Sequence, residues 1–504
     1  MSRRRTLSLS EASYLLLALT VIVHGVFFPW KGFYMDDWRF IQLWESAPTR
    51  SLSALMTAFN INGFCFYRPF DIPYFTIQFW LFGREGWAYQ ALQLVFDVSA
   101  VLLLHAAWRR ATDNAALSFV TAALFAVYPN HSATHHWLSA PFAAVAALYA
   151  GAMLLQLDAA RRKKIMPALG ATALFVVAIW TYEAVLPLAI LFPVLVALRL
   201  RLDGRPAAKA RVDAVVSCIP LVIGSFAALL YQQVLIPRLY PTGQMRPMEF
   251  VASRLFKIFG RSFECTTTGI LALAADSARN AIATGLWLLI PAVVFAAVAG
   301  YWLWRRSGAE ESEGAGGAEW LIGAAVAWAA SYAPVAISAQ GYVPHVFDEQ
   351  NRLNAAGTVG ASMLAASVLV WIARSKPRLA AVLFTVFIAL SSGIDWVAGI
   401  DYMRSWDLQR RVLSSITAQL PAGPADVALS GVPQTTGRAA VFHADWEFDS
   451  ALQVWARRAD LTGRLAPGDP IPGRRNFVYR YPEGRLEEAP RGEIRVSPNL
   501  PSQR

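Results

Sequence analysis

The stretch SYLLLALTVIVHGVFFPWKGFYMDDW, residues 13–38, joins an apolar run to two adjacent aspartates. Residues 12–30 contain no acidic or basic side chain apart from one histidine. A membrane-spanning helix needs about 20 mostly apolar residues, so this run is long enough for one. Arg3–Arg5 precede it, and no small-residue cleavage site of the signal-peptide kind follows it. We interpret the run as an uncleaved first helix that brings Asp36 and Asp37 to the membrane surface.

The composition of the whole chain indicates a membrane protein. Hydrophobic residues make up 56% of the 504 residues and charged residues 16%, whereas soluble domains have roughly 25% charged residues. A set of soluble domains is therefore excluded, and so is a disordered chain, which would be polar and poor in aromatic residues. The net charge of +11 is explained by the positive-inside rule, and no nucleic-acid partner is expected.

Eleven apolar segments qualify as membrane spans. They are 12–30, 88–108, 115–130, 138–157, 165–182, 184–199, 212–233, 281–304, 319–338, 356–373 and 379–398. A bend near Glu183 divides 165–199 into two of them. Basic clusters such as Arg161–Lys164 follow alternate segments, so eleven spans with a cytoplasmic N-terminus place these clusters in the cytoplasm. We expect an α-helical polytopic protein of the inner (plasma) membrane with an extracytoplasmic C-terminus.

Two domains are expected. Residues 1–399 form the transmembrane domain, with outer loops at 31–87, 128–137, 234–280 and 339–355. Residues 400–504 form a small extracytoplasmic α/β domain, with an amphipathic helix at 403–420. Strand-like runs follow at 426–430, 438–442, 475–480 and 493–497. The cytoplasmic loops are short and no GxxxxGK[ST] motif occurs, so ATP-driven transport by this chain is not expected.

Asp36 and Asp37 are the strongest candidates for chemistry. Adjacent carboxylates beside aromatic residues are costly to bury unless they are paired or used. One hypothesis is a general base whose pKa is raised by partial desolvation, with Mg²⁺ or Mn²⁺ as a candidate cation. The alternative is a solvated turn that ends in an aspartate helix cap.

The other candidate residues also fall on the predicted outer face. An arginine offers a planar fork suited to phosphate. The candidates for phosphate binding are Arg68, His131 and Arg352, with Tyr67, His135 and Glu183 as supporting residues. An alternative stays open for each. Arg68 could be an interfacial arginine that snorkels to the membrane surface, and Arg352 could belong to an ordinary helix start. Glu183 could form a structural bridge, and His131 and His135 could bind a metal ion as a pair.

This sidedness favours one chemistry. Acidic and phosphate-binding side chains at the outer membrane surface suit transfer from a lipid-phosphate-linked donor to a hydroxyl on an extracytoplasmic acceptor. The lipid phosphate would leave, a cationic side chain would stabilise its charge, and an aspartate would deprotonate the acceptor.

The residues also resemble a known family. Residues 67–110 read YRPFDIPYFTIQFWLFGREGWAYQALQLVFDVSAVLLLHAAWRR. This resembles the region after the first loop in transmembrane O-mannosyltransferases that carry tetratricopeptide repeats. Residues 128–139 are similar to the family's HPIHTEAVAWVS motif, 182–188 to its KE followed by a Leu/Pro-rich helix, and 352–360 to its ERYLYLPSVG motif. The Asp36–Asp37 pair matches the acidic pair of the wider GT-C class of membrane glycosyltransferases.

The resemblance covers roughly residues 12–370. It implies a GT-C fold, a polyprenyl-phosphate sugar donor entering from the bilayer, Asp36 as general base, and Asp37 orienting the acceptor or holding a cation. Inversion at the sugar is expected. Ala133 stands where the family usually has Glu, and no 34-residue repeat follows the membrane part. Protein, lipopolysaccharide and cell-wall glycan therefore stay open as acceptors.

Two other functions stay open. The chain could be a non-catalytic carrier or transporter of a lipid-linked glycan, which would need the phosphate ligands but no acidic pair. It could also be a ligase that transfers a whole glycan from a lipid pyrophosphate. A disulfide between Cys65 and Cys265, both in predicted outer loops, is a further hypothesis.

Overall fold

The computed structural model describes residues 9–60, 67–239, 252–284, 318–337, 342–347, 349–466, 471 and 473–489, with a few positions between 293 and 300. Within these residues, seven helical segments are long and apolar enough to cross a membrane. They are Ser10–Trp30, Gly86–Thr112, Phe142–Arg162, Glu183–Leu202, Ile219–Leu239, Gln350–Ser375 and Pro377–Gln419. This supports a polytopic helical membrane protein. The count of eleven stays a prediction, because 281–304 falls largely outside the described residues.

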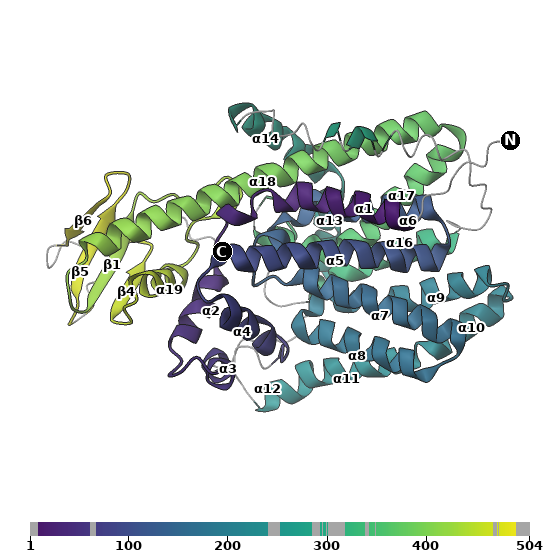
Figure 1. Ribbon diagram of the computed structural model, residues 1–504, viewed down its shortest axis with the longest axis horizontal. Helices are drawn as coiled ribbons and strands as arrows, with labels where there is room; N and C mark the ends of the chain where they lie inside the picture. Colours follow the sequence, from purple (N-terminus) through teal and green to yellow (C-terminus); the bar gives the residue numbers. More distant parts are fainter. Residues whose placement is uncertain are drawn as a thin grey trace.

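The spanning helices lie roughly side by side in one bundle (Figure 1). In chain order the bundle contains α1 (Leu9–Thr20), α5 (Gly86–Thr112), α6 (Ala115–Val127), α7 (Phe142–Arg162), α8 (Ile165–Thr181), α9 (Leu191–Leu202), α10 (Ala207–Ser217), α11 (Ile219–Leu230), α12 (Ile236–Leu239), α16 (Ala318–Ile337), α17 (Ala355–Ser375) and the first half of α18 (Pro377–Gln419). The predicted bend near Glu183 is confirmed. Tyr182 is extended, and the 3₁₀ segment η4 (Glu183–Ile190) separates α8 from α9.

The predicted first outer loop folds into three short helices at one end of the bundle: α2 (Asp36–Glu45), α3 (Leu52–Asn60) and α4 (Asp71–Phe82). Aromatic rings hold them together, with Trp44 stacked on Phe59 and on Phe79 at centroid distances of 4.8 and 5.1 Å. Burying three large rings supplies several kcal/mol, about 1.5–3 for each fully buried side chain. This packing fixes the position at which α2 begins.

Helix α18 runs unbroken for 43 residues from the bundle to the C-terminal sheet (Figure 1). The predicted boundary between residues 399 and 400 falls inside this helix. No proline interrupts residues 378–420, so the apolar span and the amphipathic stretch continue as one helix. We call the end at which α18 leaves the bundle the sheet end.

The C-terminal unit contains a four-stranded sheet of order β4-β1-β5-β6. Strand β1 (Ala425–Ser430) pairs in parallel with β4 (Leu461–Arg464) and β5 (Arg475–Arg480), and β6 (Arg485–Glu488) is antiparallel to β5. Helix α19 (Asp445–Ala456) packs between β4 and α2. Strands β4 and β6 were not predicted, because both are short and largely polar. The predicted run at 493–497 lies outside the described residues.

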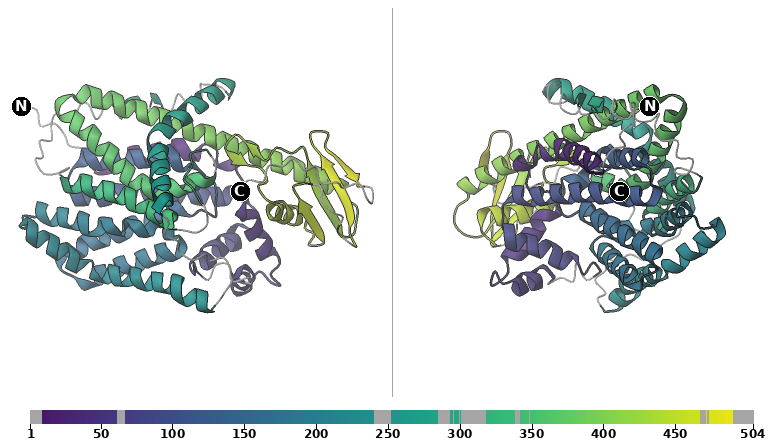
Figure 2. Two further views of the ribbon diagram at one scale, coloured as in Figure 1. Left: turned by 180° about the vertical axis from the view of Figure 1, so that it is seen from behind. Right: turned by 45° about the vertical axis from the view of Figure 1, so that its right-hand side comes forward.

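A small hairpin fastens this unit to the bundle. It consists of β2 (Thr435–Thr436) and β3 (Ala439–Ala440), so the predicted run at 438–442 forms only a two-residue strand. The buried Arg438 donates hydrogen bonds to the Ile394 carbonyl at 3.1 Å and to Ser277 Oγ at 2.7 Å. Ser277 belongs to α14 (Thr268–Thr284), which packs against α18, and α13 (Ala252–Thr266) packs against α16 (Figure 2).

The cysteine hypothesis is not resolved by these elements. Cys265 is buried at the end of α13, and Cys218 is buried between α10 and α11. Cys65 lies outside the described residues, so its pairing with Cys265 stays a prediction.

Candidate active site

Asp36 is the first residue of α2 and lies at the sheet end of the bundle. The residue before it, Met35, has φ 52° and ψ −121°, a backbone conformation that non-glycine residues rarely adopt. Such a residue costs on the order of 1–3 kcal/mol and persists only where its surroundings hold it. Strain of this size next to a carboxylate marks the turn as a candidate functional position.

Glu447 of α19 holds this turn from the C-terminal unit. Its Oε1 accepts a hydrogen bond from the Met35 amide at 2.7 Å, and its Oε2 accepts one from the His443 amide at 2.6 Å. Glu447 is fully buried, and burial outweighs these two hydrogen bonds and raises its pKa to about 8. The C-terminal unit therefore contributes directly to the position of Asp36.

Asp37 is a structural clamp in this arrangement. Its two carboxylate oxygens accept hydrogen bonds from the backbone amides of Tyr34 and Ser139, both at 3.0 Å. Burial raises its pKa to about 7. Asp37 is therefore not a solvated helix cap, and it joins the start of α2 to the loop after the 3₁₀ segment η3 (Pro129–His135).

The Asp36 carboxylate has a different environment. Burial raises its pKa, and the positive charges of Arg352 and Arg68, together with His443, act in the opposite direction. Among the described residues, no group donates a hydrogen bond to this carboxylate. Asp36 is thus a largely desolvated carboxylate in the electrostatic field of two arginines, and no hydrogen bond from the described residues occupies its oxygens.

Arg68 is held by Glu183. Its Nε and Nη2 donate to the two Glu183 oxygens at 2.6 Å each, which is the bidentate geometry that matches a guanidinium to a carboxylate. The rings of Tyr67 and Tyr182 lie 5.0 and 4.8 Å from the guanidinium carbon. The structure therefore brings Arg68, Tyr67 and Glu183 together, with Glu183 in the bridging role that was its alternative interpretation.

Arg352 is the less engaged of the two arginines. Its guanidinium lies 4.3 Å from the centre of the Trp137 ring, and no carboxylate of the described residues lies within ion-pair distance. It belongs to the 3₁₀ segment η7 (Glu349–Asn354). A cation stacked on an indole keeps its N–H groups available for an anion.

Two asparagines fasten η7 to η3. Asn351 accepts from the Ala133 amide and donates to Ser132 Oγ, both at 3.1 Å. Asn354 donates to the Asn130 and His345 carbonyls at 2.9 Å and accepts from the Tyr332 hydroxyl at 3.1 Å. Both asparagines are buried, so this network fixes the place of Arg352.

His131 and His135 do not join this site. His131 Nδ1 bonds to the Tyr128 carbonyl at 2.8 Å, and His135 Nδ1 bonds to Asp97 at 2.9 Å. Both line a small closed cavity that also contains His24. The φ of −138° at His131 departs from the helical backbone of η3. The role of His131 as a phosphate ligand stays a prediction.

Metal binding by these histidines finds no support in the described residues. No group of three or more His, Cys, Asp or Glu side chains among them is placed to hold a metal ion. Both Asp37 oxygens accept backbone amides, so the acidic pair offers only Asp36 to a divalent cation.

Sequence reasoning missed Glu447 and His443, which lie more than 400 residues from Asp36. No local motif marks either one. Asn351 and Asn354, which position Arg352, were not predicted as site residues either.

No protein-family model matches the sequence, and no curated protein matches it. Among solved structures, the chain is similar to ArnT from Cupriavidus metallidurans bound to undecaprenyl phosphate, with 15% identity, 89% of this chain and 85% of that chain covered, and a TM-score of 0.40. It is also similar to ArnT from the same organism in the apo state, with 15% identity, 94% of this chain and 93% of that chain covered, and a TM-score of 0.42.

Proposed function

We propose that this chain is a membrane glycosyltransferase of the GT-C type. It would move a sugar from a polyprenyl-phosphate donor to a hydroxyl of an extracytoplasmic acceptor. The observation that supports this most strongly is the Asp36 carboxylate at one end of a membrane bundle, which accepts no hydrogen bond from the described residues and lies in the electrostatic field of Arg68 and Arg352. A base beside phosphate-binding cations is what such a transfer needs.

The charge distribution favours an outward-facing site. Helices α5, α7 and α9 each carry arginines in their last turn, at Arg109–Arg110, Arg161–Arg162 and Arg199–Arg201. These helix ends lie at the end of the bundle opposite the sheet (Figure 1). The positive-inside rule then places them in the cytoplasm and the sheet end outside.

The proposed reaction is a single displacement. The acceptor hydroxyl gives its proton to Asp36 as its oxygen attacks the anomeric carbon. The bond between that carbon and the phosphate oxygen breaks, and polyprenyl phosphate leaves with the electron pair. Arg352 stabilises the charge that develops on the phosphate. One in-line displacement inverts the anomeric centre.

Arg68 and Asp37 would have positioning roles. Glu183 holds the Arg68 guanidinium, whose field favours the ionised form of Asp36. Asp37 fixes the start of α2. Mg²⁺ or Mn²⁺ at Asp36 and Asp37 stays a prediction.

The test separates a transferase from a carrier and a ligase. The purified full chain in nanodiscs is supplied with polyprenyl monophosphates that carry radiolabelled mannose, glucose or aminoarabinose, and with envelope fractions from a deletion strain. A transferase releases polyprenyl phosphate in step with sugar incorporation. Donor binding without release would support a carrier, and turnover of pyrophosphate-linked oligosaccharides alone would support a ligase. Either outcome would overturn the proposal.

A further inference from the structure

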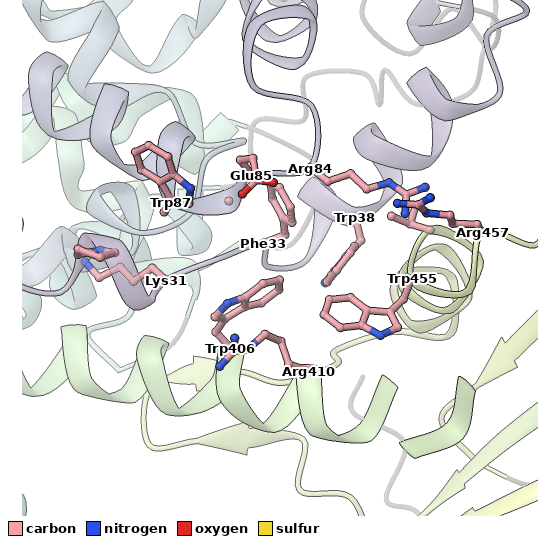
Figure 3. Close-up of a pocket in the computed structure, with 13 residues that line it drawn as sticks. Lys31, Phe33, Trp38, Arg84, Glu85, Trp87, Trp406, Arg410, Trp455 and Arg457 are labelled. Atoms are coloured by element: carbon pink, nitrogen blue, oxygen red, sulfur yellow. The ribbon is translucent and has the colours of Figure 1, made fainter. Parts of the chain in front are cut away.

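A groove of about 400 Å³ opens at the sheet end, between the start of α2, the start of α5, α18 and α19. Its walls are aromatic, formed by Phe33, Trp38, Trp87, Trp406 and Trp455 (Figure 3). Neither Asp36 nor the two arginines beside it line this groove. Trp38, however, is only two residues from Asp36, on the same helix. The groove is therefore a separate feature next to the candidate active site.

The aromatic walls are held in place from several sides. Trp38 and Trp406 stack with centroids 5.7 Å apart, and Trp455 meets them edge-on at 6.5 and 6.3 Å. Trp38 Nε1 also donates to Gln409 Oε1 at 2.8 Å. Gly32 permits the close approach of Trp406, since a Cβ there would lie 2.2 Å from its ring. These contacts make a preformed surface of flat rings.

Arginines surround these rings. Arg84, Arg410 and Arg457 line the groove, and Arg84 and Arg457 lie at one end of it in Figure 3. Glu45 pairs with Arg84, and Asp407 lies 3.3 Å from Arg410. Arg457 has no carboxylate within ion-pair distance in the described part of the chain. Glu85 also lines the groove, and Lys31 is a fourth basic side chain there, so the lining has four basic side chains and one acidic one. This excess of basic groups favours an anionic ligand.

We infer that this groove binds a saccharide that carries a phosphate or a carboxylate group, and that this saccharide is the acceptor. Sugar rings present flat C–H faces that pack on indole rings, while their hydroxyl groups accept hydrogen bonds from indole N–H groups. Arginine forks suit phosphate and carboxylate groups. The volume lies within the usual range for small-ligand pockets, about 300–1,000 Å³. The acceptor role relies on the proposed function; saccharide binding does not.

Tryptophan and arginine are also typical of membrane interfaces, where they contact lipid head groups. Two observations favour a saccharide. Phe33 and Trp38, at the base of the groove, are only 2% and 1% exposed. Helix α19, from the C-terminal unit, also closes one side, so the groove is a concavity between two parts of the protein and not a lipid-facing ridge.

Direct binding tests this inference. The purified Asp36→Asn chain in phosphatidylcholine nanodiscs is applied to an array that pairs neutral oligosaccharides with their phosphorylated and uronic-acid counterparts. The assay measures saccharide binding and not sugar transfer, so its result does not depend on whether the chain is a transferase. Inorganic phosphate and phosphatidylglycerol vesicles serve as competitors. We expect anionic saccharides to bind at least about tenfold more tightly than their neutral counterparts.

Exposed rim residues provide the variants, because their replacement should not prevent folding. The double variant Arg410→Gln/Arg457→Gln should lose the preference for anionic saccharides, and Trp87→Ala, which removes a half-exposed ring, should weaken binding of all saccharides. Trp371→Ala and Arg480→Gln remove an exposed tryptophan and arginine elsewhere and should change neither. The inference would be overturned if no saccharide binds, or if the groove variants bind saccharides as the parent chain does. Full competition by phosphate or phosphatidylglycerol would also overturn it.

Discussion

Glu447 and Met35 are 412 positions apart in the chain, yet the Glu447 carboxylate accepts a hydrogen bond of 2.7 Å from the Met35 amide. Met35 has the strained backbone that sets the start of α2, and Asp36 follows it directly. The C-terminal unit is thus part of the candidate site and not an appendage. It acts by fixing the direction in which the Asp36 side chain leaves the backbone.

Removing the Glu447 carboxylate should disturb both stability and transfer. Glu447→Ala leaves the amides of Met35 and His443 without acceptors, at a cost of about 1–3 kcal/mol for that of the buried Met35. We expect a lower melting temperature and a lower kcat with little change in donor KM. Glu447→Gln keeps one acceptor oxygen and should retain more of both. Equal activity in wild type and Glu447→Ala would exclude the positioning role.

The pH dependence of stability gives a second test. In the folded protein the pKa of Glu447 is about 8, against an ordinary value of 4.5. The folded state therefore binds more protons than the unfolded state between these values, so the contribution of Glu447 to stability falls as pH rises from about 4.5 to 8. Asp37, whose pKa is about 7, acts in the same direction, whereas Lys31, with a pKa lowered to about 7, acts in the opposite direction.

Glu447→Gln isolates this contribution, since it removes one titrating group and leaves the other two. From pH 5 to pH 8, the melting temperature of the wild type should fall relative to that of Glu447→Gln. A difference between the two proteins that is constant across this range would show that Glu447 titrates normally.

The two arginines should behave differently when replaced. Arg352 has no carboxylate partner among the described residues, so Arg352→Ala should leave stability nearly unchanged and reduce kcat/KM for the donor about 10²–10³-fold, as expected for loss of a charge-stabilising group. Arg352→Lys should recover part of this activity. Donor kinetics and thermal melts on the same samples would check this.

Arg68→Ala should mainly affect stability, because it leaves Glu183 without its bidentate partner. A hydrogen bond to a charged group contributes about 1.5–3 kcal/mol, and the lower value is expected here because the Glu183 side chain is 40% exposed. The double variant Arg68→Ala/Glu183→Ala should regain part of that stability. If the double variant is less stable than Arg68→Ala, Arg68 is not the main partner of Glu183.

The hydrogen bonds of Asn351 and Asn354 should be required to hold Arg352 in position. Asn354→Ala removes three hydrogen bonds of a buried side chain, so we expect a stability loss of a few kcal/mol. Asn354→Asp is a stricter test because it keeps the size but loses the two donors. Donor KM should rise in both variants. An unchanged donor KM would show that this network does not contribute to donor binding.

The sequence predicted the parts of this fold that depend on local pattern. Apolar runs of sufficient length located the spans, and the length of 165–199 required a bend, which was predicted near Glu183. Asp36 was found because a desolvated carboxylate next to a span is costly. Arg68 and Glu183 were each noted, but their pairing depends on how the turn before α4 meets the end of α8, which no local pattern encodes.

The remaining features depend on tertiary structure. His131 was predicted as a phosphate ligand, and the sequence did not show that its Nδ1 bonds to the Tyr128 carbonyl or that His135 Nδ1 bonds to Asp97. Glu447 reads in the sequence as an ordinary acidic residue in the first turn of a helix. Only the packing of α19 on α2 makes it a partner of Met35.

The most direct test of the central claim is single-turnover transfer by Asp36→Asn in nanodiscs, measured from pH 5 to pH 9 with the labelled donor. Asp113→Asn, which changes an exposed aspartate that follows α5 at the end of the bundle opposite the sheet, is the matched control. We predict a loss of about 10²–10⁴-fold for Asp36→Asn with donor binding retained, and a rate near wild type for the control. Transfer by Asp36→Asn within a few-fold of wild type would contradict the assignment of Asp36 as the general base.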